Sequence, residues 1–317
     1  MFTATAELPR LRITFGADET GVFDAGLPVL AGEAVENLFG AAHSAGRAGP
    51  LALFQTKDWL LGAATVPLAA DLDETTHRLY AAIFQATRGW HLARIWNYVP
   101  GINEPDAAGL ERYRVFCRGR SLAFEEHHGQ GFKALLPSAS AVGCKSEALT
   151  VAFAASPLRP RHVENPLQVP AYDYPHEYGP RAPSFARATV VAGPHHSTVF
   201  ISGTAAIRGH ATVAPHSLRQ QLECALENLH EISGACGLGS DLGQGGGYAR
   251  HFKVYVRHGE DQPRIAAVLE ERLLVGADRV SYLQADICRA PLLVEIEASL
   301  FRSQLQQSSG AITPPPA

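Results

Sequence analysis

The stretch SLRQQLECALENLHEI, residues 217–232, indicates most clearly how this chain folds. Ser217 and Gln220 form a capping-box start and Gly234 predicts the end of a helix. Its apolar residues recur at helical spacing: Leu218, Leu222, Ala225, Leu226, Leu229 and Ile232. Around this helix the pattern predicts strands at 188–192, 198–204, 252–257, 280–289 and 292–300, and a second amphipathic helix at 262–275.

The second half therefore has the order ββαβαββ, and the first half repeats it. Strands are expected at 51–54, 59–66, 91–99, 133–142 and 149–154, and helices at 72–87 and 106–127. The repeated order predicts the fold class α+β, with two ββαβαββ units in tandem and helices on one face of each sheet. Residues before Leu51 are interpreted as an irregular extension with one strand at 11–15.

Proline marks the boundary between the halves. Residues 156–170 contain four prolines in fifteen residues, which disfavours a helix and indicates an extended linker. We predict an N-terminal domain with its extension (1–155), a linker rich in Pro, Tyr and Arg (156–187), a C-terminal domain (188–303) and a disordered tail (304–317).

The composition excludes several classes of protein. Of the 317 residues, 46% are hydrophobic and 18% are charged, which is ordinary for a globular protein and unlike collagen, a coiled coil or a disordered chain. No apolar run reaches the length of about 20 residues that a membrane helix needs. The formal charge of -4 disfavours a nucleic-acid partner.

Cysteine and histidine give no metal or cofactor motif. The five cysteines are scattered without a CxxC pair, and the start of the chain has no secretory pattern, so we expect a cytoplasmic protein. The sequence has 14 histidines but no HExxH, and we expect no metal site. The glycine-rich residues 237–247 lack the Lys-Ser/Thr ending of a phosphate loop, and no cofactor is expected.

The stretch ADICRAPLLVEIEA, residues 285–298, carries the strongest chemical signal. On the final strand Glu295 and Glu297 face opposite to Val294 and Ile296. An arginine such as Arg289 at a neighbouring strand end grips a carboxylate with its planar fork, and a buried glutamate with a raised pKa can act as a general acid. The alternative is a structural Arg-Glu pair across a turn. Cys288 is either a reactive thiol beside this site or a small packing residue.

Two further segments supply candidate binding groups. Residues 172–187 hold three tyrosines and two arginines, and Tyr172, Tyr178 and Arg181 could orient an oxygen-rich anionic ring from this stiff segment. An aromatic clasp between the halves is the alternative. Arg120 lies three residues after Cys117 on a predicted helix, so it can share the inner face, although a solvated arginine is the default.

Several separated motifs resemble known families. Residues 201–205, 222–229, 254–256 and 288–297 resemble the Rid (YjgF) family, in which the arginine matching Arg289 clamps a ligand carboxylate between subunits. Read over about residues 50–300, the chain resembles the chorismatases through five motifs in the same order: RIWNYVPGIN (94–103), YRVFCRGR (113–120), NPLQVPAYDYP (165–175), YGPR (178–181) and CRAPLLVE (288–295).

The resemblance implies an activity and roles for residues. Chorismatases release the enolpyruvyl group of chorismate as pyruvate without a cofactor, and the glutamate matching Glu295 protonates the enol ether. The cysteine at Cys288 is similar to that of the type that forms 3-hydroxybenzoate, in one group together with 4-hydroxybenzoate. That type has a glycine where this chain has Ala205-Ala206, which makes Ala206 a candidate contact and keeps a dihydroxycyclohexadiene carboxylate open as the product.

The two carboxylates of chorismate call for at least two cationic groups, for which Arg120, Arg181 and Arg289 are the candidates. The other hypotheses are a Rid-type imine hydrolase or ligand-binding protein and a mutase-like isomerase. Because Rid units form trimers with sites at their interfaces, a homotrimer also stays open.

Overall fold

The computed structural model describes residues 7–16, 21–68, 71–194 and 196–303, so the predicted tail at 304–317 lies outside the described residues. Both predicted ββαβαββ units are present. The first consists of β5 (Leu51–Gln55), β6 (Leu60–Pro67), α1 (Leu72–Ala86), β7 (His91–Pro100), α2 (Arg112–His128), β8 (Ser138–Cys144) and β9 (Ala148–Ser156). The second consists of β11 (Ala188–Ala192), β12 (His196–Ala205), α3 (Leu218–Cys236), β15 (Ala249–Val256), α4 (Gln262–Arg272), β16 (Arg279–Gln284) and β17 (Val294–Ser303).

The two units share one topology. The first sheet has the strand order β5-β6-β9-β7-β8 and the second has the corresponding order β11-β12-β17-β15-β16. In each, the strands on either side of the second helix (β7 and β8, β15 and β16) are parallel and the other neighbours are antiparallel. This identity of order confirms the predicted α+β fold with two tandem units.

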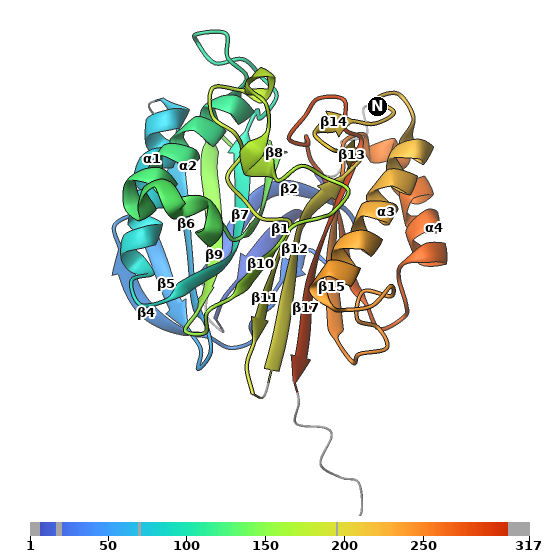
Figure 1. Ribbon diagram of the computed structural model, residues 1–317, viewed down its shortest axis with the longest axis horizontal. Helices are drawn as coiled ribbons and strands as arrows, with labels where there is room; N and C mark the ends of the chain where they lie inside the picture. The colour runs from blue at the N-terminus through green and yellow to red at the C-terminus, as the bar shows by residue number, and fades with distance from the viewer. Residues whose placement is uncertain (1–6, 17–20, 69–70, 195, 304–317) are drawn as a thin grey trace, which may run out of the picture.

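The molecule has four layers, with the helices outside and the two sheets packed against each other. Figure 1 shows α1 and α2 on one side and α3 and α4 on the other. Each helix pair covers its own sheet with a separate apolar core. A third core fills the space between the sheets and combines Trp96 and Tyr98 of β7 with Phe200 of β12 and Tyr255 of β15. Functional groups on the inner faces of the sheets are therefore shielded from water.

The N-terminal extension is more regular than the sequence predicted. It contains β1 (Arg10–Thr14), β2 (Val22–Gly32), β3 (Val35–Glu36) and β4 (His43–Ala48), so the prediction of a single strand was wrong. Strand β2 pairs with β16, and β1 and β3 continue the second sheet, whereas β4 pairs with β5 of the first. The extension covers an open edge of the second sheet, which would otherwise expose unpaired backbone groups.

Several predicted boundaries were also wrong, for local reasons. Helix α2 begins at Arg112 instead of 106, because the Asp106 carboxylate accepts the backbone N–H groups of Ala108 and Leu110 and forms a turn. Helix α3 passes Gly234 and ends at Cys236, and Gly237 follows with a φ of 81° as the left-handed cap. Helix α4 ends at Arg272 instead of 275.

Two strands are shorter than predicted. The strand expected at 133–142 is β8 and starts at Ser138, because residues 129–135 form the 3-10 helix η2 (Gly129–Leu135). The strand expected at 280–289 is β16 and ends at Gln284. Cys288 and Arg289 therefore lie in the loop between β16 and β17.

The proline-rich connection is partly ordered into elements. Strand β10 (Arg161–Val163) pairs with β11, and the single turns η3 (Ala171–Asp173) and η4 (His176–Tyr178) follow it. Ala186 at its end forms a parallel bridge with Ser138 of β8. The connection therefore runs along the seam between the units. No helix among the described residues is long and apolar enough to cross a membrane.

Candidate active site

A cavity of about 450 Å³ opens between the two units. Its walls come from α2 and β8 of the first unit, from the connection between the units, and from β12, the β16–β17 loop and β17 of the second. One chain thus supplies all of these walls. The volume lies in the range of small-molecule sites.

Glu295 forms part of the wall on the inner face of β17. Its neighbours Val294 and Ile296 point the other way, into the core beneath α3 and α4, as the alternation of the strand predicted. On the neighbouring strand β12, Ala205 pairs with Glu295, and the register shifts just before it, between Ile201 and Thr204, which is a bulge. Gly203 lies within this bulge, and a Cβ there would clash with the Glu295 carboxylate. The bulge and the glycine make the space that the acid occupies.

Burial changes the acidity of Glu295. The side chain is 3% exposed, and removal from water, together with the negative charge of Glu297, raises its pKa to about 8. The positive charges of Arg94 and Arg187 oppose this shift but do not outweigh it. At neutral pH Glu295 is therefore mainly protonated and can donate a proton into the cavity.

Two buried arginines in the wall have hydrogen-bond donors without partners. Arg120 on α2 is 1% exposed, and its Nε and Nη2 atoms meet no acceptor in the described part of the chain. Arg187 is 6% exposed; its Nη2 donates to the Tyr174 hydroxyl at 2.7 Å, but its Nε has no acceptor among the described residues. The ring of Phe185 lies beneath both guanidinium groups. Buried cations with free donors are costly unless a ligand satisfies them, and a carboxylate has the matching shape.

Arg289 reaches the cavity from the β16–β17 loop. Its guanidinium lies over the ring of Tyr178, 4.1 Å from the centroid, and donates to the His210 carbonyl at 2.8 Å and to Thr212 Oγ1 at 3.2 Å. The Tyr178 hydroxyl is 3.1 Å from Nδ1 of His210. These contacts fix the orientation of Arg289 and Tyr178, both of which line the cavity.

Cys288 also lines the cavity, next to Arg289. It is half-buried, and burial, reinforced by the negative charge of Glu295, raises its pKa to about 12. The thiol is therefore protonated at neutral pH, which disfavours a role as a nucleophilic thiolate. The thiol is small and weakly polar, so it adds little hydrogen-bonding capacity to the wall.

Three of the candidates from the sequence lie outside the cavity. Arg181 forms an ion pair with Glu125 on the outer side of α2, and Tyr172 lies beneath the Lys133 ammonium in the same outer depression. Ala206 is fully buried in a small apolar cluster, whereas its neighbour Ala205 lines the cavity. Arg181, Tyr172 and Ala206 therefore do not line this cavity, because their partners come from distant segments, and their contact with a substrate stays a prediction.

Two wall residues that the sequence did not single out, Arg187 and Gly203, matter most for the site. Arg187 is the last residue of the Tyr- and Arg-rich segment and lines the cavity, where Arg181 had been expected to bind the substrate. Gly203 belongs to the motif at 201–205, but only its contact with Glu295 shows why a glycine is needed. The two arginines within residues 172–187 were a signal for Arg187. The sequence pattern held no signal for Gly203.

The fold and the site together define an α+β protein of two tandem units, with an acid and buried arginines in a cavity between them. Comparison with known proteins makes this class specific. The family described as "Chorismatase FkbO/Hyg5-like, N-terminal" matches residues 38–155. A protein named chorismatase from Streptomyces rapamycinicus is 42% identical over 254 residues, 77% of this chain and 75% of the relative.

Two further comparisons agree. A protein named 3-hydroxybenzoate synthase from Streptomyces hygroscopicus is 38% identical over 251 residues, 76% of this chain and 73% of the relative. A crystal structure of a chorismatase is similar over 94% of this chain and 95% of its own, with a TM-score of 0.73 and 31% identity. The chain belongs to the chorismatase family.

Proposed function

We propose that this enzyme cleaves chorismate to pyruvate and 3-hydroxybenzoate, with 4-hydroxybenzoate as a second product. The observation that carries the proposal is Glu295, an acid with a pKa of about 8 in a cavity that also holds two buried arginines with free donors. The relative named 3-hydroxybenzoate synthase, which is 38% identical, supports this choice of product.

In the proposed reaction Glu295 protonates the methylene carbon of the enolpyruvyl ether. This creates an oxocarbenium-like centre and makes the side chain a good leaving group. The oxygen of the neighbouring C4 hydroxyl then attacks ring carbon C3 and gives its proton to the Glu295 carboxylate. The bond from C3 to the ether oxygen breaks, and its electron pair forms the ketone carbonyl of the departing pyruvate, which leaves a 3,4-epoxide on the ring. The C4–O bond of the epoxide then opens, the C3 proton is lost to complete the aromatic ring, and the oxygen on C3 takes up a proton to become the phenol of 3-hydroxybenzoate. Pyruvate and hydroxybenzoate together contain the atoms of chorismate, so no water is consumed.

The arginines bind the two carboxylates of the substrate. Arg120 and Arg187 offer unpartnered donors from the first unit and from the connection, and Arg289 offers a third guanidinium with its orientation set by Tyr178. Groups from several elements hold the ring and the enolpyruvyl ether close to Glu295. Such positioning contributes much of the rate in a reaction without a cofactor.

Cys288 determines the product in this proposal. Its thiol lies beside Glu295 and Arg289, where it keeps water from the activated ether. Cys288→Ala removes this volume and admits water, so the yield of aromatic product should fall in favour of the dihydroxycyclohexadiene carboxylate, while pyruvate release continues. Chromatography and mass analysis of the products compare this variant with the wild type. Cys236→Ala, a buried thiol at the far end of α3, is the control and should leave the product spectrum unchanged.

One incubation separates the alternatives. Purified protein is mixed with chorismate, and pyruvate and ring products are measured together. A chorismatase releases both, whereas a mutase gives no pyruvate at that step and a Rid-type imine hydrolase leaves chorismate intact. A wild-type product that is only the diene diol would contradict the assignment to 3-hydroxybenzoate but would keep the chorismatase reaction.

The proposal includes a cytoplasmic location and a site within one chain. All five cysteines are free thiols, which supports a reducing compartment such as the cytoplasm. The cavity walls described above come from one chain, so this site does not need the interface that a Rid-type homotrimer would provide. Light scattering of the purified protein tests the trimer directly.

A further inference from the structure

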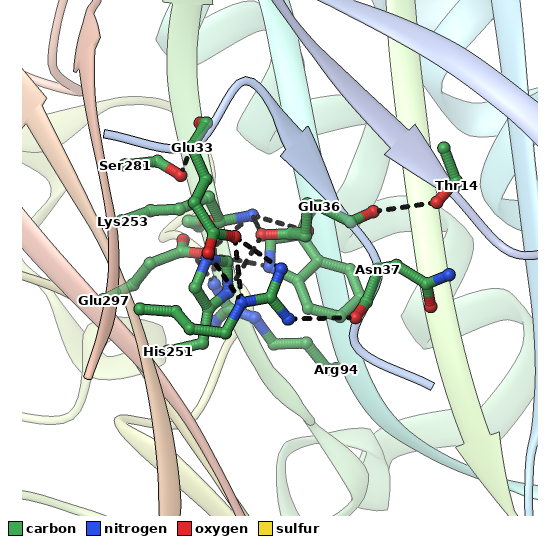
Figure 2. Close-up of polar contacts among 12 residues, drawn as sticks. Thr14, Glu33, Glu36, Asn37, Arg94, His251, Lys253, Ser281 and Glu297 are labelled. Atoms are coloured by element: carbon green, nitrogen blue, oxygen red, sulfur yellow. Dashed lines mark hydrogen bonds and ion pairs between the residues drawn. The ribbon is translucent and has the colours of Figure 1, made fainter. Parts of the chain in front are cut away.

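Four charged side chains form a second cluster between the sheets, outside the cavity wall. They are Glu36, Arg94, Lys253 and Glu297, which we call the buried ion cluster; each is at most 2% exposed. Lys253 Nζ lies 2.9 Å from Glu36 Oε2 and 3.0 Å from Glu297 Oε1, and Arg94 Nη2 lies 2.6 Å from Glu297 Oε2. Figure 2 shows these side chains meeting from β3, β7, β15 and β17. Two carboxylates and two cations balance in charge.

Glu297 is the centre of the cluster. Its Oε1 also accepts a hydrogen bond from Trp96 Nε1 at 2.9 Å, and its Oε2 accepts one from the Tyr255 hydroxyl at 3.0 Å. Burial alone disfavours the charged carboxylate, but Arg94 and Lys253 outweigh it and lower the pKa of Glu297 to about 2. Glu297 is therefore a fixed negative charge at any physiological pH.

This fixed charge lies next to the proposed catalytic acid. Glu295 and Glu297 are two residues apart on the same face of β17, a separation of roughly 7 Å along the strand. Arg94 joins the cluster to the cavity, since its Nη2 also donates to Ser140 Oγ at 2.9 Å and Ser140 lines the wall. Glu297 is also the group whose charge most strongly opposes ionisation of Glu295.

We propose that Glu297 is a positioning residue of the reaction, a permanently ionised carboxylate that keeps the neighbouring Glu295 protonated for proton donation. The inference rests on the proposed function only in the statement that Glu295 donates its proton to a substrate. A neutral group in its place would leave Arg94 and Lys253 uncompensated beneath the cavity, and both would favour ionised Glu295. The ion pairs thus reduce the effect of Arg94 and Lys253 on the pKa of Glu295.

The neighbours of both carboxylates come from several elements. Glu297 faces Arg94, Trp96 and Tyr98 of β7, Lys253 and Tyr255 of β15, Ser140 of β8 and, through Lys253, Glu36 of β3. His251 lies 3.6 Å from Glu36, and burial lowers its pKa, so it is neutral at pH 7. Glu295 shares the cavity wall with Arg120, Arg187, Cys288 and Arg289.

The test is a direct titration of Glu295. The protonated carboxyl band is followed by infrared spectroscopy against pH, and the spectrum of Glu295→Gln is subtracted to isolate this group. In Glu297→Gln the midpoint should fall by about 1–2 pH units, the effect of one charge at this distance in a protein interior. Because the titration uses no substrate, it decides the inference even if chorismate is not cleaved. With turnover, the basic limb of kcat/KM against pH should move by the same amount.

Two further variants separate this effect from structural damage. Glu36→Gln removes the same charge from the far side of Lys253, so its shift should be much smaller. Glu297→Gln combined with Lys253→Met removes one carboxylate and one cation together and serves if the single variant does not fold. The fall of the midpoint should be smaller but still present, because Arg94 is left near Glu295 without its carboxylate. An unchanged midpoint in the folded Glu297 variant, single or double, or an equal shift in Glu36→Gln, would overturn the proposal.

Discussion

Two groups of buried charge lie between the same two sheets, and they differ in how their charges are satisfied. In the buried ion cluster, Arg94 and Lys253 each meet a carboxylate at 3.0 Å or less. In the cavity, Arg120 and Arg187 form no ion pair in the described part of the chain and retain donors without acceptors. Both cations of the cluster thus have an anionic partner, although Arg94 Nη1 also lacks an acceptor among the described residues, whereas the two cavity arginines have no anionic partner there.

This difference indicates that the buried ion cluster mainly stabilises the fold and that the cavity mainly binds a ligand. A paired buried charge stabilises the native state mainly because removal of one partner strands the other. An unpaired buried cation contributes nothing of this kind and is explained by a ligand that supplies the missing carboxylate. Substitutions in the cavity should therefore mainly change activity. Substitutions in the cluster should mainly change stability, except that Glu297, next to Glu295, should also affect the pH dependence of activity.

The largest expected effect is that of Glu295→Gln, which keeps the size and polarity of the side chain but removes its acidity. We expect kcat to fall by roughly 10²–10⁴-fold while chorismate still binds, since this is the usual contribution of a general acid. Steady-state pyruvate release and calorimetry measure the two quantities. Near-normal turnover would remove Glu295 from the mechanism.

In the cluster, Lys253→Met keeps the length of the side chain but leaves Glu36 without its cation and Glu297 with Arg94 alone. The free energy of unfolding should fall by about 3–5 kcal/mol, the cost of breaking a buried pair. Urea denaturation measures it, with Arg272→Met as the matched control at the surface pair Arg272–Glu223, where less than about 1 kcal/mol is expected. Equal losses in the two variants would show that the cluster is no more important than a surface pair.

In the cavity, Arg120→Met should weaken chorismate binding and leave the stability nearly unchanged, unlike Lys253→Met. Chorismate affinity should fall by about 10- to 150-fold, equivalent to about 1.5–3 kcal/mol for a charged hydrogen bond, because a carboxylate loses its donors. The free energy of unfolding should change little, since no anion is stranded. Binding is measured by calorimetry in the Glu295→Gln background, and Arg289→Lys, which keeps the charge but loses the planar fork, should also weaken it. Unchanged affinity in both variants would refute the proposed carboxylate contacts.

The smallest effect is expected for Arg181→Ala. Arg181 is partly exposed and pairs with Glu125 outside the cavity, so kcat/KM should change by less than about twofold and stability by less than about 1 kcal/mol. Steady-state kinetics and urea denaturation measure both. A loss of affinity as large as that of Arg120→Met would return Arg181 to the site.

Much of the fold was predictable because its signals are local. Helical and alternating patterns identified both units, and the alternation of β17 placed Glu295 and Glu297 on one face. Predicted boundaries were wrong where a local hydrogen bond formed a turn next to an element, as at Asp106 before α2. Strand β2 was missed because it is ordered by the edge of β16, more than 240 residues away in the chain.

The sequence alone determined the two repeated units, the strand face of the acid and the presence of several arginines near it, since these depend on neighbours within a few residues. Only the tertiary structure decided which arginines are buried with free donors and which are paired. Arg181 meets Glu125, 56 residues away, and Glu36 meets Lys253, 217 residues away. Whether a charge is neutralised depends on such distant partners, because side-chain pairing requires proximity in space and no local pattern records it.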